Sequence, residues 1–348
     1  MKARAAITNI GAYLLLAGFG LTMSVPLLWM ISTSLKDPSA VGLYPPRWIP
    51  TRPEMVSVAG KQYPAGLLQE RGRRATVAIV AARPGQRVIL DARGKERIVP
   101  SSSVVPKEAI HLEWSNYARA WKALRVERGF LGLLRNADGF LVFYLNSLLV
   151  TFCVTTGQLV TCSLAAFAFA RLRFRARDAL FLAYLATLMV PAVVTMIPLF
   201  GLMRMARLTD TYWALILPGL FSAYGTFLLR QFFMTVPTEL EDAARIDGAG
   251  PFSIYWRIIM PLSKPALATL GTFVFLHTWN DFLWPLIVID DLGKKTLPIG
   301  LAHFQGPYLT EWHLLMAASV IVMFPVLIVF VIGQRYFVRG IALSGLKA

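Results

Sequence analysis

Cysteine is scarce in this chain of 348 residues, and its placement excludes two kinds of covalent or metal site. The two cysteines, Cys153 and Cys162, lie in one apolar run. On a helix their nine-residue separation is a rise of about 13 Å, which no disulfide can bridge. They also lack the paired Cys and His spacing of a zinc site. We therefore expect apolar, buried thiols and no bound metal.

Residues for catalysis and for nucleotide binding are also lacking. No G-x-x-x-x-G-K-[ST] phosphate loop occurs, because Gly94-Lys95 and Gly293-Lys294 lack both the upstream glycine and the following Ser or Thr. The chain has only four histidines, and they are scattered: His111, His277, His303 and His313. No Ser/His/Asp or metal-ligand constellation has credible spacing. We expect no enzyme activity, no ATP hydrolysis by this chain and no cofactor.

Apolar residues, by contrast, are abundant. Hydrophobic residues make up 56% of the chain and charged residues only 16%, more apolar than a soluble core of this size requires. The net charge of +16 would suggest a nucleic acid partner in a soluble protein. Here the basic residues lie in short runs between apolar stretches, without a recognisable basic and aromatic module. The composition predicts a membrane protein that does not bind nucleic acid.

Six apolar runs are long enough to cross a hydrocarbon core that requires about 20 helical residues. They are residues 7–31, 142–170, 179–202, 212–233, 265–289 and 314–337. The first run exceeds a signal peptide's short apolar region and has no convincing cleavage site, so we expect it to be retained. The predicted class is an all-α polytopic membrane protein with six transmembrane helices. Prolines inside the runs, Pro191 and Pro198 foremost, predict kinks.

The basic residues predict the orientation. Four arginines between 171 and 177 crowd the second connection, and Arg335, Arg339 and Lys347 follow the last run. Because short cytoplasmic loops are rich in Lys and Arg, we expect both termini to be cytoplasmic. The first connection, about 105 residues long, can lie outside despite its arginines, since long domains translocate largely regardless of charge.

Short β-prone stretches within that first connection predict a small extracytoplasmic β insertion at about 52–111. They are Val56 to Val58, Ala75 to Val80, Arg87 to Leu90 and Arg97 to Val99, separated by Gly60, Pro84-Gly85 and Arg93-Gly94-Lys95. The expected organisation has three parts: a first helix at 1–35, the connection at 36–140, and a transmembrane core at 141–348 that includes a cytoplasmic loop at 237–265.

That loop is the most informative segment. Thr238 with Glu241 three residues later predicts a capping box, further acidic residues occupy the first turn, and Gly248 or Gly250 can end the helix. A helix this short needs tertiary support. Its small side chains on one face are typical of a docking helix. An amphipathic helix on the membrane surface fits the same pattern.

The loop resembles the EAA loop of the permease subunits of ATP-binding-cassette importers. Asp242-Ala243-Ala244, Gly248, Ile258, Met260 and Pro261 follow that motif, with Asp242 in place of its usual Glu and Met260 in place of its usual Leu. The resemblance implies a coupling helix that inserts into a cleft of the ATPase subunit. The implied coupling residues are Glu241, Asp242, Ala243, Ala244, Asp247, Gly248, Ile258 and Pro261.

Both ends of the chain are similar to sugar-importer permeases of the maltose-transporter type. The similar segments are Ser34 to Asp37 with Tyr44 to Trp48, Trp279 to Leu286, Gln334 to Gly340, and the tail Ser344 to Ala348. The similarity covers about 1–50 and 112–348, so the β segment is an insertion of unassigned role. Asn280 and Asp281 are the first candidates to line the transport pathway, since polar groups at membrane depth require partners or water. They could equally hold the fifth run against a neighbouring helix.

The resemblance implies a bacterial inner-membrane permease that translocates a carbohydrate or related solute, such as an oligosaccharide or glycerol phosphate, by alternating access. Its implied partners are a second permease, two ATPase subunits and an extracytoplasmic solute-binding protein. Two other hypotheses stay open: an ion-coupled secondary transporter or channel without an ATPase, and a membrane-anchored binding protein that acts through the β insertion.

Overall fold

The computed structural model describes residues 2–42, 45–70, 73–83, 85–91, 94–306 and 310–344. Tyr44, Pro84, Arg93 and the tail from residue 345, all used in the sequence analysis, lie outside these residues. The chain divides into two compact units, one of residues 1–120 with 304–320 and the other of residues 121–303 with 321–348.

The first unit begins with the long helix α1 (Lys2–Ser34), which is followed by α2 (Pro38–Val41). Asn116, in α3 (Ser115–Lys122), is fully buried at the end of α1. Its amide Nδ2 donates to the carbonyl oxygens of Ser34 and Lys36, at 2.8 Å each. These two bonds satisfy carbonyls that the end of a helix leaves without an intrahelical partner.

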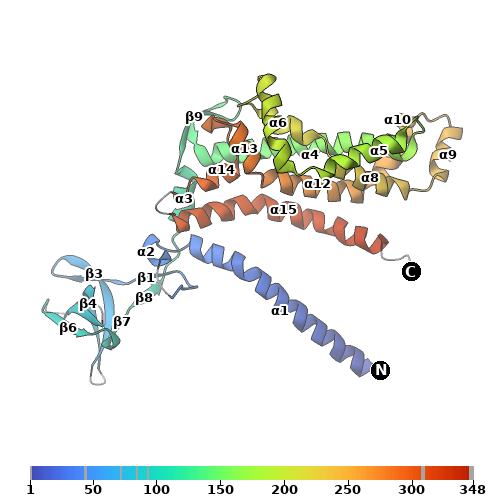
Figure 1. The fold of residues 1–348 in the computed structure, drawn as a ribbon. Helices are drawn as coiled ribbons and strands as arrows, with labels where there is room; N and C mark the ends of the chain where they lie inside the picture. The colour runs from blue at the N-terminus through green and yellow to red at the C-terminus, as the bar shows by residue number, and fades with distance from the viewer. Residues whose placement is uncertain are drawn as a thin grey trace. The chain divides into compact units, whose positions relative to one another are not determined.

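Antiparallel strands fill the stretch between α2 and α3 (Figure 1). They are β1 (Thr51–Pro53), β2 (Met55–Val58), β3 (Lys61–Glu70), β4 (Arg73–Arg83), β5 (Gln86–Leu90), β6 (Glu96–Pro100), β7 (Val104–Pro106) and β8 (Glu108–Ile110). β2 to β6 pair in sequence order, β7 returns to pair with β3, and β1 pairs with β8. A short 3-10 turn, η1 (Ser101–Ser103), precedes β7. The core of the sheet consists of Leu68, Val77, Ile89, Val99 and Val104.

The all-α class predicted from the apolar runs is therefore wrong for the chain as a whole. A substantial β-sheet region accompanies the helices. Its buried side chains lie mostly at consecutive positions, such as Val77 and Ala78 in β4 and Val88 to Leu90 in β5, rather than in the strict alternation of a sheet with one covered face.

The second unit is arranged around α4 (Gly139–Arg171). The hairpin of β9 (Arg125–Gly129) and β10 (Leu134–Asp138) leads directly into α4, while α8 (Ala223–Met234) and α12 (Lys264–Trp279) pack along it (Figure 1). The apolar core includes Val150, Val154, Cys162 and Ala166 of α4 together with Leu229 and Phe233 of α8. A close approach at Gly225 lets these helices meet.

The remaining elements of the second unit are short, apart from α15, whose first part belongs to the first unit. They are α5 (Arg177–Ala186), η2 (Thr187–Met189), α6 (Ala192–Met205), α7 (Tyr212–Ile216), η3 (Leu217–Leu220), α9 (Glu239–Ile246), α10 (Pro251–Ile254), the π-helical turn η4 (Tyr255–Ile259), α11 (Met260–Leu262), α13 (Leu283–Val288), η5 (Leu292–Lys294), α14 (Leu297–Ala302) and α15 (Trp312–Ser344).

Four segments of the described chain are long and apolar enough to cross a membrane: Asn9–Ser34, Gly139–Arg171, Tyr212–Met234 and Trp312–Arg335. Two bent pairs raise the number to as many as six if each pair is one span. Arg177–Met189 meets Ala192–Met205 at 101°, and Pro251–Leu262 meets Lys264–Trp279 at 78°. Six spans therefore stay a prediction.

The bends have local causes. Pro191 lies between the two helices of the first bent pair, Arg177–Met189 and Ala192–Met205. Proline lacks an N–H and disfavours helical backbone at the residue before it, so the helix is interrupted there. The expected fifth run, residues 265–289, is also interrupted, since α12 ends at Trp279 and α13 begins at Leu283. Trp279 is fully buried, and its indole Nε1 donates to the carbonyl of Val322 in α15 at 3.2 Å.

Replacing Gly225 by leucine tests the close packing of α4, α8 and α12. A Cβ atom at Gly225 would lie 3.0 Å from Sγ of Cys162 and 3.2 Å from Cδ1 of Leu270. We expect Gly225→Leu to destabilise the protein by about 1–3 kcal/mol through overpacking, measured as thermal unfolding in detergent. Gly201→Leu in α6 is the matched control, because nothing lies within 4 Å of its Cβ position. Equal stability of the two variants would contradict this packing.

Candidate functional site

Part of the loop at 237–265 that the sequence analysis singled out folds as helix α9 (Glu239–Ile246). It follows Val236 and carries Glu239, Glu241 and Asp242 in its first turn, where negative charge opposes the positive end of the helix dipole. At its other end Gly248 adopts a φ of +84°, and the amide of Ala249 donates to the carbonyl of Ala244 at 2.8 Å. Of the two glycines expected to end the helix, Gly248 does so in the left-handed conformation.

The predicted capping box is wrong. Thr238 has helical backbone angles, and its side chain makes no capping hydrogen bond. Glu241 does not reach back to Thr238, because its carboxylate turns into the protein and is buried. Instead of the expected capping bond to Thr238, Glu241 forms an ion pair with Arg171 of α4.

That ion pair joins α9 to the last residue of α4. Nε of Arg171 lies 3.0 Å from Oε1 of Glu241, and the two side chains are only 6% and 4% exposed. The two atoms lack the alignment of a hydrogen bond, so the contact is electrostatic. The same guanidinium donates to the carbonyl oxygens of Phe233 and Val236. Arg245, on the outer side of α9, lies 3.6 Å from both Glu241 Oε2 and Asp242 Oδ1.

The opposite side of α9 faces outward. Asp242, Ala243 and Asp247 are exposed, and Ile246 is 87% exposed. Ala244 instead packs against the core of the second unit.

A groove of about 450 Å³ lies beside this face. It is lined by Ala244, Asp247, Gly248, Ala249, Gly250, Ser253, Arg257 and Ile258. The structure thus brings four predicted coupling residues to one groove: Ala244, Asp247, Gly248 and Ile258. Glu241 points away from solvent, and Pro261 lies exposed in α11, outside the lining residues.

The two remaining candidates, Asn280 and Asp281, lie at the break between α12 and α13. Nδ2 of Asn280 donates to the carbonyl of Leu276 at 2.7 Å, and Oδ1 of Asp281 accepts from the amide of Trp284 at 3.4 Å. Each side chain therefore serves the end of a helix. Their part in a transport pathway stays a prediction.

Asp281 also lines an enclosed cavity of about 20 Å³, together with hydroxyl-bearing residues of α4, α12 and the segment before α14. They are Ser147, Thr151, Thr278 and Thr296. Ligand pockets for small organic molecules measure about 300–1,000 Å³. In this conformation the cavity is too small for a sugar.

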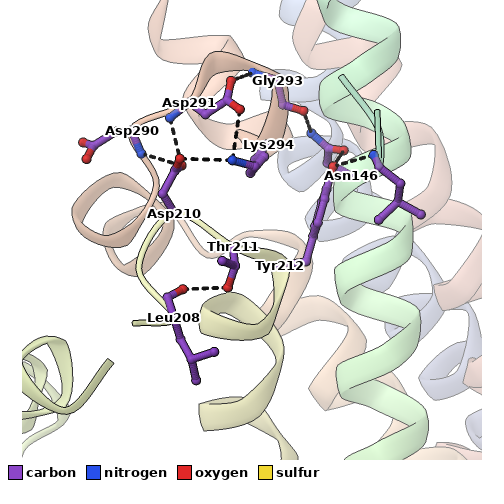
Figure 2. Close-up of polar contacts among 10 residues, drawn as sticks. Asn146, Leu208, Asp210, Thr211, Tyr212, Asp290, Asp291, Gly293 and Lys294 are labelled. Atoms are coloured by element: carbon purple, nitrogen blue, oxygen red, sulfur yellow. Dashed lines mark hydrogen bonds and ion pairs between the residues drawn. The ribbon is translucent and has the colours of Figure 1, made fainter. Parts of the chain in front are cut away.

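A buried polar cluster at the start of α4 was missed by the sequence analysis (Figure 2). Asn146 is fully buried; its amide donates to the carbonyls of Gly293 at 3.0 Å and Lys295 at 2.9 Å, and it accepts from the Tyr212 hydroxyl at 2.7 Å. An asparagine inside an apolar run was the available signal. Its partners lie too far along the chain for spacing to reveal them.

Asp210 is the second centre of this cluster (Figure 2). Its carboxylate accepts from the amides of Asp290 and Asp291 and lies 3.0 Å from Nζ of Lys294. Burial opposes ionisation of Asp291, but hydrogen bonds from Gly293 and Lys294 leave the pKa of its carboxyl below the usual value. Burial likewise opposes the charge of Lys294, but Asp210 and Asp291 raise the pKa of its ammonium group.

The conformation at Gly248 can be tested with a neighbouring glycine as control. Gly248→Ala forces a Cβ into the left-handed region, which costs about 1–2 kcal/mol, while nothing surrounds that position within 4 Å. We expect faster amide hydrogen exchange across residues 239–246. Gly250→Ala has equally open space and a φ of −73°, so it should leave exchange unchanged. Identical exchange in both variants would contradict the assigned helix end.

The region of this chain that matches known proteins includes α9 and the groove beside it. A family model described as "Binding-protein-dependent transport system inner membrane component" matches residues 160–343. The chain is 37% identical over 218 residues to the arabinooligosaccharides transport system permease protein AraQ of Halalkalibacterium halodurans, covering 63% of this chain and 78% of that protein. It is 37% identical over 230 residues to the sn-glycerol-3-phosphate transport system permease protein UgpE of Yersinia pestis bv. Antiqua, covering 66% and 79%.

A solved structure has the same fold. It is that of a bacterial ABC transporter involved in the import of the acidic polysaccharide alginate, which matches with a TM-score of 0.65 and 22% identity over 95% of this chain and 96% of the other. The predicted resemblance to permeases of binding-protein-dependent sugar importers is confirmed at the level of the family.

Proposed function

The chain belongs to the family of binding-protein-dependent transport system inner membrane components, and from this we propose that it is the permease subunit of an ATP-binding-cassette importer for a carbohydrate or related solute. Oligosaccharides and glycerol phosphate are the solute classes named for its relatives. The chain would carry no ATPase activity of its own, because it has no phosphate loop.

The main structural support for this proposal is the exposed face of helix α9. It presents Asp242, Ile246 and Asp247 outward beside an open groove, while its buried side is fixed to α4 and α8. A surface of this kind suits insertion into the cleft of a separate ATPase subunit. The predicted surface-helix alternative would instead place these acidic residues against lipid headgroups.

The proposed assembly follows from the family and from the site. A second permease would complete the transmembrane pathway, two ATPase subunits would dock on the coupling helices, and a solute-binding protein would deliver the solute from outside. The proposed orientation has both termini and α9 on the cytoplasmic side of a bacterial inner membrane, in agreement with the arginines at 171, 173, 175 and 177.

The proposed mechanism is alternating access. ATP-driven closure of the ATPase subunits would move the coupling helix and shift the permease between inward-facing and outward-facing states. A partner shifts such an equilibrium only as far as its affinity differs between the two states. The contacts between α9 and the ATPase subunit must therefore differ between the two states.

Purification from native membranes in mild detergent, followed by mass spectrometry, tests the assembly. We expect an ABC ATPase and a second permease to accompany the chain, and the proteoliposomes to take up solute only with ATP. Recovery of the chain alone, with uptake driven by an ion gradient and no ATP, would overturn the proposal in favour of a secondary transporter.

Charge reversal at Asp242 tests the docking role of α9. Asp242→Lys replaces an exposed acid on the outward face, and we expect recovery of the ATPase subunit and solute uptake to fall by about tenfold, equivalent to 1.4 kcal/mol. Asp290→Lys is the control, since it makes the same charge change at an exposed position in the polar cluster at the other end of α4. It should retain the ATPase subunit. Normal import by Asp242→Lys would rule out this docking surface.

A further inference from the structure

We infer that Arg171 is the positioning residue that makes α9 and the ends of α4 and α8 move as one body. This inference rests on the proposed function, because it assigns the route by which movement of the coupling helix reaches the transmembrane helices. No sequence motif used above includes Arg171 in the coupling site.

The geometry of one guanidinium supports the inference. Arg171 is the last residue of α4, and its Nε lies 3.0 Å from Oε1 of Glu241 in the first turn of α9. Its NH2 group donates to the carbonyl of Phe233, in the last turn of α8, and to that of Val236, in the link to α9. One side chain of α4 thus contacts the end of α8, the link and the start of α9, which follow one another between residues 233 and 241.

Each contact satisfies a specific need. At the end of α8 the carbonyl of Phe233 accepts from the amide of Val236 at 3.2 Å and also from Arg171, whose positive charge opposes the helix dipole there. The Glu241 carboxylate is buried, and a buried charge requires a partner. Arginine has five donors in a planar fork and can serve several acceptors, whereas lysine offers one compact ammonium group.

Burial makes the junction stiff. Both charged side chains are more than nine-tenths buried, and separating a buried pair leaves an uncompensated charge in each half. Phe233, which supplies one of the carbonyls, is itself fully buried in the apolar core. A hinge between α9 and α4 would have to break this pair, so α9 is expected to carry the end of α4 with it.

The two acidic neighbours on α9 therefore have separate roles. Glu241 faces inward and holds the helix to the permease, while Asp242 faces outward and is available to the ATPase. Loss of the inward contact should leave the ATPase bound and disconnect its closure from the transmembrane helices. Loss of the outward contact should weaken binding of the ATPase.

Arg171→Lys tests this division in the complete transporter, reconstituted with its ATPase subunits and binding protein. We expect the variant to retain its ATPase subunit while the solute imported per ATP hydrolysed falls by about tenfold. A change of this size is typical of substitutions that weaken the energetic coupling between two sites. Arg175→Lys is the matched control, the same replacement at an exposed arginine of the same connection. It should stay within about twofold of the unmodified transporter.

The neutral variants of the two acids provide a second comparison. Glu241→Gln should lower solute imported per ATP and leave ATPase recovery unchanged, whereas Asp242→Asn should lower ATPase recovery. Full coupling in both Arg171→Lys and Glu241→Gln would overturn the inference while leaving the proposed function intact. Absence of ATP-dependent uptake in the unmodified transporter would instead overturn the proposed function.

A distance measurement keeps the inference testable if the variants fail to fold. Spin labels on Leu164→Cys in α4 and Glu239→Cys in α9, both exposed positions, report the separation of the two helices in a background with Cys153→Ala and Cys162→Ala. We expect the distance to agree between nucleotide-free and ATP-trapped transporter. A change greater than one helical turn, about 5 Å, would show that α9 moves independently and overturn the inference.

Discussion

The second unit depends on the requirement that the polar groups buried at both ends of α4 find partners. Along most of its length α4 contributes apolar atoms to the core, but Asn146 and Arg171 bring amide and guanidinium groups into it. An unpaired buried polar group is costly, so each of them selects which loops can assemble around it. Asn146 binds residues 212, 293 and 295, and Arg171 binds residues 233, 236 and 241. The helix between them spans about 37 Å, so it connects two polar clusters at opposite ends of the bundle.

This arrangement explains why α9 can be short. A helix of eight residues is not stable in isolation. Glu241 and Ala244 attach it to the permease from the inside, and Gly248 turns the chain sharply at its end. On the outward side, Asp242 pairs with Arg245 of the same helix rather than with another element. If α9 docks on a partner as proposed, a backbone held in place before binding raises the affinity, because less conformational entropy is lost.

The sequence predicted the features that depend on local pattern and failed where distant contacts decide. Apolar length led to four segments that are long enough to cross a membrane, or up to six if each bent pair is one span, and turn residues within the first connection identified the β-prone stretches. The capping box failed because Arg171, 70 positions before Glu241, competes successfully for its carboxylate. Hydropathy presented residues 265–289 as one run, although Asn280 and Asp281 end one helix and begin another. The partners of Asn146 lie up to 149 positions away, beyond any periodicity.

The polar groups at the break after α12 also bear on where a solute could pass. A pathway enclosed by this chain alone would need a hydrated space large enough for a sugar, with side chains free to bind hydroxyls. Asn280 and Asp281 instead bond to helix ends, and the cavity beside Asp281 measures about 20 Å³. Opening it to several hundred cubic ångströms would require separating α12 and α13 from α4, and all three helices contribute buried residues to one apolar core, among them Val150, Leu270 and Trp284. Movement of this chain against a second subunit would leave that core intact. A pathway between two permeases therefore disrupts fewer buried contacts than a pathway within one.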